Sequence, residues 1–184
     1  MRPEYEGRSL AELALERNRA PSETVLDLLL ESEGEADMCS FMMSEENVTL
    51  GLGQPFVMIG SDGEGRTPHG PLSGGKPHPR NYGTCPRLLG HYVRERGVLS
   101  LETAIKKLTS LPAGKLRLRD RGVLRPGAFA DVVIFDPGTV ADPATFTDPH
   151  RYPVGIPWVL VNGQPVIAEG RHTGACPGRI LTRA

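Results

Sequence analysis

The residues best placed for chemistry come directly after a short apolar run. Phe56–Ile59 ends at a glycine, and Ser61-Asp62-Gly63 follow it. Four apolar residues ended by glycine are typical of a strand that is buried on both faces, as in a parallel sheet. A carboxylate just past such a strand lies where α/β barrels place catalytic side chains, so Asp62 is a candidate catalytic residue. The plainer interpretation is a turn, because Asp and Gly both favour turns.

A long loop leaves from the end of this predicted strand. Nine of the twenty residues from Ser61 to Arg80 are glycine or proline, and the loop carries His69 and His78. A structureless loop of this length inside a compact domain is usually functional or disordered. Its departure from the end of the strand favours an active-site loop.

The histidines do not form a recognisable metal motif. The chain has five of them, His69, His78, His91, His150 and His172. They include no His-x-His and no pair at helical i, i+4 spacing. A new site built from Asp62, His69 and His78 is disfavoured, because a zinc site also needs a supporting outer shell. We therefore expect no metal ligands in this chain.

The three cysteines, Cys39, Cys85 and Cys176, are far apart and odd in number. That pattern fits neither a disulfide framework nor a zinc ribbon. We expect reduced, structural thiols, because buried cysteine behaves as a small hydrophobe.

Composition narrows the class of protein. The chain has 184 residues, about one domain, with 39% hydrophobic and 23% charged residues and a net charge of −1. This balance excludes an electrostatic footprint for nucleic acid or an acidic membrane surface. The longest apolar runs are only a few residues, so no segment is expected to span a bilayer. The first four residues lack the apolar core of a secretory signal, which favours a cytoplasmic protein.

The first part of the chain reads as helices alternating with strands. Two short helices are predicted within 7–31, a strand at Met38–Met43, and a helix after Ser44 that ends near Leu52. With Phe56–Ile59, this alternation implies parallel strands joined by crossover helices. Two more helices are predicted, one beginning at Thr84-Cys85-Pro86 and one capped by Ser100 and closed at Leu111-Pro112.

The last third reads as a small β module with a boundary near residue 120. We predict a strand and turn over 121–127 and a β-branched strand over 131–136. Trp158–Val161 and Gln164–Ala168 flank Asn162-Gly163, which supplies the positive φ angles of a type I′ hairpin.

Several blocks together resemble a known family, the N-acyl-D-amino-acid deacylases (D-aminoacylases) of the metal-dependent amidohydrolase superfamily. The matching blocks are Ile59-Gly60-Ser61-Asp62-Gly63, His78-Pro79-Arg80-Asn81-Tyr82-Gly83-Thr84, Pro86-Arg87-Leu88-Leu89-Gly90, Leu108-Thr109-Ser110-Leu111-Pro112-Ala113, Arg121-Gly122 with Pro126-Gly127, Ala130-Asp131-Val132-Val133-Ile134-Phe135-Asp136 and Val159-Leu160-Val161-Asn162-Gly163. The likeness runs from about residue 7 to about residue 181. The His-Pro-Arg and Tyr-Gly-Thr run narrows it to the D-aminoacylase branch.

The resemblance implies an α/β fold. Residues 1–120 would be the C-terminal portion of a (β/α)₈ barrel, containing its last two strands, Met38–Met43 and Phe56–Ile59. Residues 121–184 would be part of a small β-sandwich. Two of eight strands cannot close a barrel, so an open apolar edge is expected.

The resemblance also implies a chemistry. Asp62 matches the family's catalytic aspartate, and the family hydrolyses a non-peptide carbon–nitrogen bond in N-acyl-D-amino acids with a zinc-activated water. A metal lowers the pKa of bound water to about 7, and a nearby carboxylate can act as general base and then general acid. The family's His-x-His pair, its cysteine ligand and its two further histidines have no counterpart here. This chain is expected to bind no zinc alone and to be inactive as a fragment.

Two further residues are candidates for substrate binding. His78 and Arg80 lie in the matched block beside the predicted barrel mouth. The guanidinium of Arg80 is well shaped for a substrate carboxylate, but it would serve equally to tie down the long loop.

Three functions stay open at this point. The chain is a part of a deacylase that needs a complementary N-terminal amidohydrolase chain, a non-catalytic remnant that acts as a binding or assembly module, or a related cyclic-amide hydrolase. The His78-Pro79-Arg80 block argues against the third.

Overall fold

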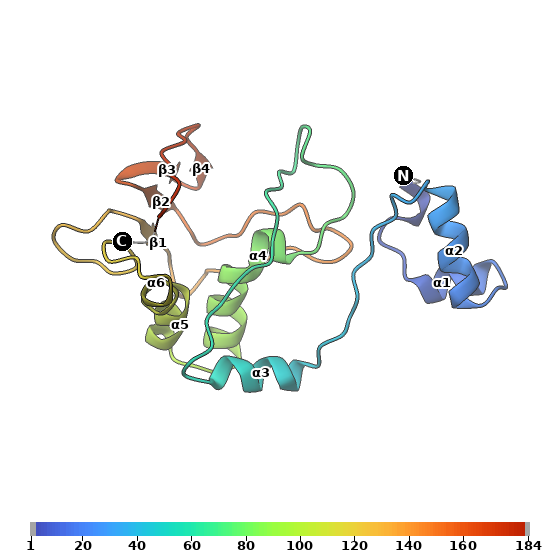
Figure 1. The fold of residues 1–184 in the computed structure, drawn as a ribbon, viewed down its shortest axis with the longest axis horizontal. Helices are drawn as coiled ribbons and strands as arrows, with labels where there is room; N and C mark the ends of the chain where they lie inside the picture. Colours follow the sequence, from blue (N-terminus) through green and yellow to red (C-terminus); the bar gives the residue numbers. More distant parts are fainter. Residues whose placement is uncertain (1–2, 183–184) are drawn as a thin grey trace.

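The computed structural model describes residues 3–182, in which helices precede a small antiparallel sheet (Figure 1). The helices are η1 (Pro3–Tyr5), α1 (Leu10–Glu16), α2 (Pro21–Glu31), α3 (Glu45–Gly53), α4 (Arg80–Arg87), the π-helix η2 (Leu88–Glu95), α5 (Leu101–Leu108) and α6 (Ser110–Leu116). The strands are β1 (Val132–Ile134), β2 (Trp158–Val161), β3 (Gln164–Ala168) and β4 (Arg171–His172), in the order β1-β2-β3-β4. Within residues 3–182, no helix is long and apolar enough to cross a membrane.

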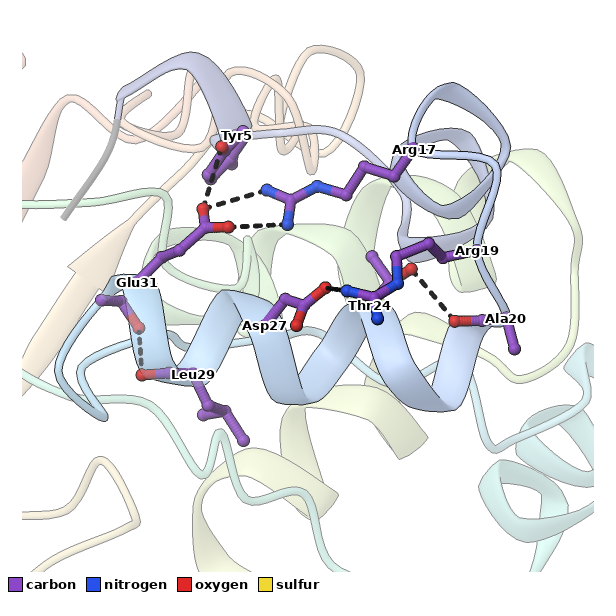
Figure 2. A network of polar contacts seen from close by, with 9 residues as sticks. Tyr5, Arg17, Arg19, Ala20, Thr24, Asp27, Leu29 and Glu31 are labelled. Atoms are coloured by element: carbon purple, nitrogen blue, oxygen red, sulfur yellow. Dashed lines mark hydrogen bonds and ion pairs between the residues drawn. The ribbon is translucent and has the colours of Figure 1, made fainter.

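The two N-terminal helices form as predicted. Ser9 and Glu12 make a complete capping box at the start of α1, which satisfies backbone donors that the helix leaves free. A polar network joins the helices (Figure 2): the Arg17 guanidinium donates to both carboxylate oxygens of Glu31, at 2.8 and 3.0 Å. The Tyr5 hydroxyl donates to the same carboxylate at 3.0 Å. These contacts hold α1 and α2 to each other, and the pair lies at one end of the molecule, away from the sheet.

The two predicted barrel strands are not strands in the structure, so this part of the prediction is wrong. Both Met38–Met43 and Phe56–Ile59 lie outside the sheet, which contains β1 to β4. A strand exists only where neighbouring chains complete its hydrogen-bond ladder. Within the described residues, no parallel neighbour lies beside either segment, and the only ladders are antiparallel.

Phe56–Ile59 is nevertheless held in place by a buried lysine on α5. Lys107 is only 2% exposed, and its Nζ donates to the Val57 carbonyl at 2.9 Å and to the Gln54 carbonyl. The Ile59 amide donates in turn to the Lys107 carbonyl at 3.3 Å. These bonds satisfy a buried cation and fix the direction from which the chain approaches Asp62.

Two predicted helix boundaries are also wrong. The helix expected to begin at Thr84-Cys85-Pro86 begins four residues earlier, at Arg80. Thr84 is not a cap; its hydroxyl donates to the Arg80 carbonyl. Pro86 removes a hydrogen bond inside the helix, and the chain continues as a π-helix two residues later. Pro112 does not close a helix either, because it stands in the first turn of α6, where its missing N–H is not needed.

The core lies where one face of α4 and η2 meets the connection between β1 and β2. Leu88, Leu89 and Tyr92 are buried there with Val140. Gly83 and Gly90 make this approach possible. A Cβ on Gly90 would lie 2.5 Å from the Val140 carbonyl oxygen, and one on Gly83 would overlap the Asp142 carboxyl group.

The β module contains the predicted hairpin. β2 and β3 are antiparallel, and Asn162 and Gly163 have φ of 50° and 81° in the turn between them. The strand predicted within 121–127 does not form. Arg121 instead pairs with Asp131 and donates to the Asn162 side chain at 2.6 Å, so this segment braces the hairpin turn from outside the sheet.

Candidate functional site

Asp62 stands at the start of the long loop, in a left-handed turn. Its φ is 47°, a conformation that costs most L-residues about 1 kcal/mol and that Asp tolerates better than most. The next amide, that of Gly63, donates to the Ser61 hydroxyl at 3.2 Å. The carboxylate is 87% exposed. The segment is irregular chain with a local turn closed by the Ser61 side chain, and it presents the Asp62 carboxylate to solvent.

Arg80, the first residue of α4, reaches back across the loop to this carboxylate. Its guanidinium nitrogen lies 2.9 Å from Asp62 Oδ2. Eighteen positions in the sequence separate the two residues, so this ion pair joins the two ends of the loop of 61–79. The pair is open to water, and its contribution to stability is small for that reason.

His78 contacts Arg80 at its backbone amide. Its Nδ1 accepts a hydrogen bond from the Arg80 amide at 3.0 Å, and its ring meets the edge of Phe146 at 5.0 Å between centroids. Partial burial, and then the nearby charge of Arg80, lower the pKa of His78 below its ordinary value. A neutral ring with an unprotonated Nδ1 is the form that can accept this bond. The structure thus brings Asp62, His78 and Arg80 together.

Asn81 is a fourth member of this group that the motifs did not single out. Its side-chain carbonyl accepts a hydrogen bond from the Glu64 amide at 2.6 Å, two residues beyond Asp62. Asn81 stands in the matched block beside Arg80, but no local pattern in the sequence connects it to residue 64.

His150 is also linked to the loop, from a segment that comes after β1. Its Nε2 lies 3.0 Å from the Gly75 carbonyl and its Nδ1 2.8 Å from the Tyr82 hydroxyl. Because the carbonyl can only accept, Nε2 carries the proton and Nδ1 accepts from the hydroxyl. His150 and Tyr82 are 68 positions apart, a separation that no spacing rule detects.

A mostly apolar pocket of about 260 Å³ lies beside the core residues Leu52, Leu88 and Tyr92. It lies between α3, the 58–60 segment and the α4–η2 helix, and its lining includes Met58, Gly60, Thr84 and Tyr92. Gly60 is the lining residue nearest in sequence to Asp62. Asp62 is thus two residues from a lining residue in the sequence, but it does not line the pocket itself.

The residues described do not fit a metal site. Within residues 3–182, no three His, Cys, Asp or Glu side chains come close enough together to hold a metal ion. His69 does not join Asp62 and His78 in such a group. The cysteines are free, and the exposure of Cys39 and Cys176 contradicts the expected burial of structural thiols, whereas burial raises the pKa of the Cys85 thiol. Cys39 and Cys176 lie on irregular chain, and Cys85 lies on α4.

Sequence relatives cover nearly the whole of this chain. A D-aminoacylase from Alcaligenes xylosoxydans xylosoxydans is 46% identical over 181 residues, which is 98% of this chain and 35% of the relative. An N-acyl-D-glutamate deacylase from the same organism is 42% identical, over 98% of this chain and 34% of the relative. The chain thus spans about a third of the length of the curated relatives that it matches.

The solved structures that resemble this chain are also deacylases, and the chain again covers about a third of each. A D-aminoacylase studied for its binuclear metal centre superposes with a TM-score of 0.83 at 42% identity, over 99% of this chain and 36% of that one. An N-acyl-D-glutamate deacylase from Bordetella bronchiseptica, complexed with zinc and a phosphonate mimic of the tetrahedral intermediate, superposes at 0.77 and 40% identity, over 92% and 34%. The model of the Amidohydrolase family matches residues 51–167. This match covers the Asp62 turn, α4 and most of the hairpin, and the chain belongs to the amidohydrolase family.

Proposed function

We propose that this chain is the C-terminal part of an N-acyl-D-amino-acid deacylase, a hydrolase of non-peptide carbon–nitrogen bonds. The observation that carries the proposal is the likeness to D-aminoacylases over 98% of the chain, together with the Asp62–Arg80 pair at 2.9 Å. In this assignment Asp62 accepts a proton and returns it to the departing amine, as general base and then general acid. In a complete deacylase, the segments 38–43 and 56–59, which form no strands in this chain, would become the last two strands of a (β/α)₈ barrel, and the sheet of β1 to β4 would be part of a β-sandwich.

Arg80 is assigned to the substrate carboxylate. An N-acyl-D-amino acid carries one carboxylate, and a guanidinium binds such a group with two parallel hydrogen bonds. In the present structure Arg80 already holds a carboxylate, that of Asp62. We propose that the substrate exchanges with Asp62 for this guanidinium, which would free Asp62 for proton transfer. His78 keeps Arg80 in position by accepting its amide hydrogen.

Zinc has no group of ligands among the described residues of this chain. Residues 3–182 bring no three potential ligands together, whereas a related deacylase was solved with zinc. We propose that any metal ligands belong to the other two thirds of a complete deacylase. The part assigned to this chain is proton transfer by Asp62 and carboxylate binding by Arg80.

The proposed partner is a polypeptide corresponding to that remaining two thirds. The segment 38–43 supports this assignment: Phe41, Met42 and Met43 are each more than 70% exposed, although the Phe41 ring meets that of Phe146 at 4.6 Å between centroids. None of these residues has a backbone hydrogen bond to another described residue. An extended apolar segment with free donors and acceptors can be completed by strands added on both sides.

The test is complementation. The 184-residue chain would be produced alone and together with the N-terminal two thirds of a D-aminoacylase, and hydrolysis of an N-acetyl-D-amino acid would be measured. We expect no turnover and no stoichiometric zinc from the chain alone, and turnover from the mixture. Turnover by the chain alone would contradict the need for a partner. An assembled but inactive mixture would contradict the deacylase assignment and favour a binding module.

The Asp62→Asn variant tests the catalytic role within that mixture. It keeps the size and the turn but cannot take up a proton, so we expect kcat to fall by at least about 100-fold, the usual lower range for general acid–base catalysis. Asp148→Asn is the matched control, because Asp148 is an exposed, ion-paired aspartate in the connection between β1 and β2. It should leave kcat unchanged. A fully active Asp62→Asn enzyme would exclude Asp62 from proton transfer.

A further inference from the structure

The side-chain oxygen of Asn81 holds the turn that carries Asp62. Asn81 touches the turn in two ways: its Oδ1 accepts the Glu64 amide at 2.6 Å, and its Cα lies beside Gly63. A Cβ on Gly63 would come within 3.0 Å of Asn81 Oδ1 and 3.2 Å of Asn81 Cα. A side chain at position 63 would therefore crowd Asn81 and push the loop away from α4 by a few tenths of an ångström.

The same turn has few other restraints. The Asp62–Arg80 pair is open to solvent, and the bond from the Gly63 amide to the Ser61 hydroxyl lies within the turn itself. Asp62 has a φ of 47°, which an L-residue leaves readily when nothing restrains it. Asn81 is itself fixed on α4, since its amide donates to the His78 carbonyl at 3.1 Å.

We infer that Asn81 is a positioning residue for Asp62. By holding the Glu64 amide, it keeps the turn left-handed and so holds the Asp62 carboxylate within reach of Arg80. The side chains of 80 and 81 thus act as a pair: Arg80 binds the carboxylate, and Asn81 binds the backbone that presents it. The effect of Asn81 on catalysis rests on the proposed function, whereas its effect on the position of Asp62 rests on the contacts described above.

The test compares Asn81→Ala with Asn81→Asp in the 184-residue chain. Alanine removes the acceptor, whereas aspartate keeps an oxygen at the same place. Two NMR readouts are followed: hydrogen exchange of the Glu64 amide, and the amide–Hα coupling of Asp62, which reports its φ. Thr84→Val is the matched control, because it removes another side-chain hydrogen bond of α4, to the Arg80 carbonyl, and leaves the Asn81 acceptor for the Glu64 amide in place.

We expect Asn81→Ala to speed Glu64 exchange about tenfold, the effect of losing one ordinary hydrogen bond, and to change the Asp62 coupling. Asn81→Asp and Thr84→Val should stay close to the unmodified chain. Unchanged exchange in Asn81→Ala would overturn the inference. Faster exchange with an unchanged Asp62 coupling would also overturn it, since Asn81 would then anchor the loop without positioning Asp62.

A second measurement links the inference to catalysis. In the complemented enzyme, Asn81→Ala should lower kcat with little change in KM, and Asn81→Asp should recover most of the loss. Equal losses in both variants would count against positioning through the acceptor oxygen. An inactive unmodified mixture would contradict the proposed function alone, because exchange and coupling need no turnover.

Discussion

At the scale of single residues, His78 links the site to pH. Its pKa is lowered in the folded chain, so the unfolded chain binds a proton to His78 at a higher pH than the folded chain does. Stability therefore rises with pH wherever only the unfolded His78 is protonated, and it falls as the pH drops below about 6.5, the ordinary value. Protonation of Nδ1 also removes the acceptor for the Arg80 amide.

Urea unfolding between about pH 7.5 and pH 5, a range that brackets the ordinary histidine pKa, measures this effect. The unmodified chain should lose stability as the pH falls, and His78→Asn, which cannot titrate, should lose less. His172→Asn serves as the control, because His172 lies exposed on β4, away from the site. Equal pH dependence in His78→Asn and the unmodified chain would contradict a role for His78.

Lys107 is a second unusual residue, because it is a charged side chain in a buried position. A lysine that is only 2% exposed is rare unless its charge is paired or hydrogen-bonded, and here two backbone carbonyls accept from it. Lys107→Met keeps the apolar stem and removes the donors, which takes from the Val57 carbonyl its bond to Nζ and leaves the Gln54 carbonyl with only the Val57 amide, at 3.3 Å. We expect a loss of about 2 kcal/mol in the free energy of unfolding. Lys106→Met, on the exposed side of the same helix, should change it by less than about 0.5 kcal/mol.

At the scale of elements, the sequence predicted what is determined locally. The two helices within 7–31, the helix that begins after Ser44 and the Asn162-Gly163 hairpin each depend on residues a few positions apart, and all of them are present. Strand formation at 38–43 and 56–59 depends on neighbours distant in sequence, so an apolar run alone could not establish it. The start of α4 was misplaced because Thr84 and Pro86 imitate a helix N-terminus inside a longer helix.

Two helical glycines allow a prediction at this scale. Gly90 faces the Val140 carbonyl at a distance that excludes a methyl group, whereas a Cβ added to Gly114 on α6 would have no neighbouring atom within 4 Å. Gly90→Ala should therefore destabilise the chain by about 1–3 kcal/mol through overpacking. Gly114→Ala should stabilise it by about 0.5–1 kcal/mol, because alanine is the better helix former. Thermal unfolding of both variants tests the packing, and a neutral Gly90→Ala would contradict it.

At the scale of the whole molecule, the site was only partly readable from the sequence. Asp62, His78 and Arg80 were proposed as site residues because they lie in blocks that resemble the deacylases, and in the structure Arg80 contacts both of the others. Asn81 and His150 were missed because their partners, Glu64 and Gly75, lie in a loop that has no periodicity. Side-chain contacts across such a loop depend on its three-dimensional path.

The exposed apolar segment 38–43 provides the prediction for the molecule as a whole. Changing Met42 and Met43 to lysine puts a charge on each face of the segment, and a strand buried on both faces cannot accept either one. The double variant should fold as the unmodified chain does, since both side chains are already more than 70% exposed, but it should fail to assemble with the complementary polypeptide. Sedimentation of the mixture and its deacylase activity measure this. Ile180→Lys is the control, because Ile180 is 96% exposed and lies far along the chain from the segment. Assembly that survives in the double variant would show that the partner binds elsewhere, whereas assembly lost equally in Ile180→Lys would indicate a general effect of added charge.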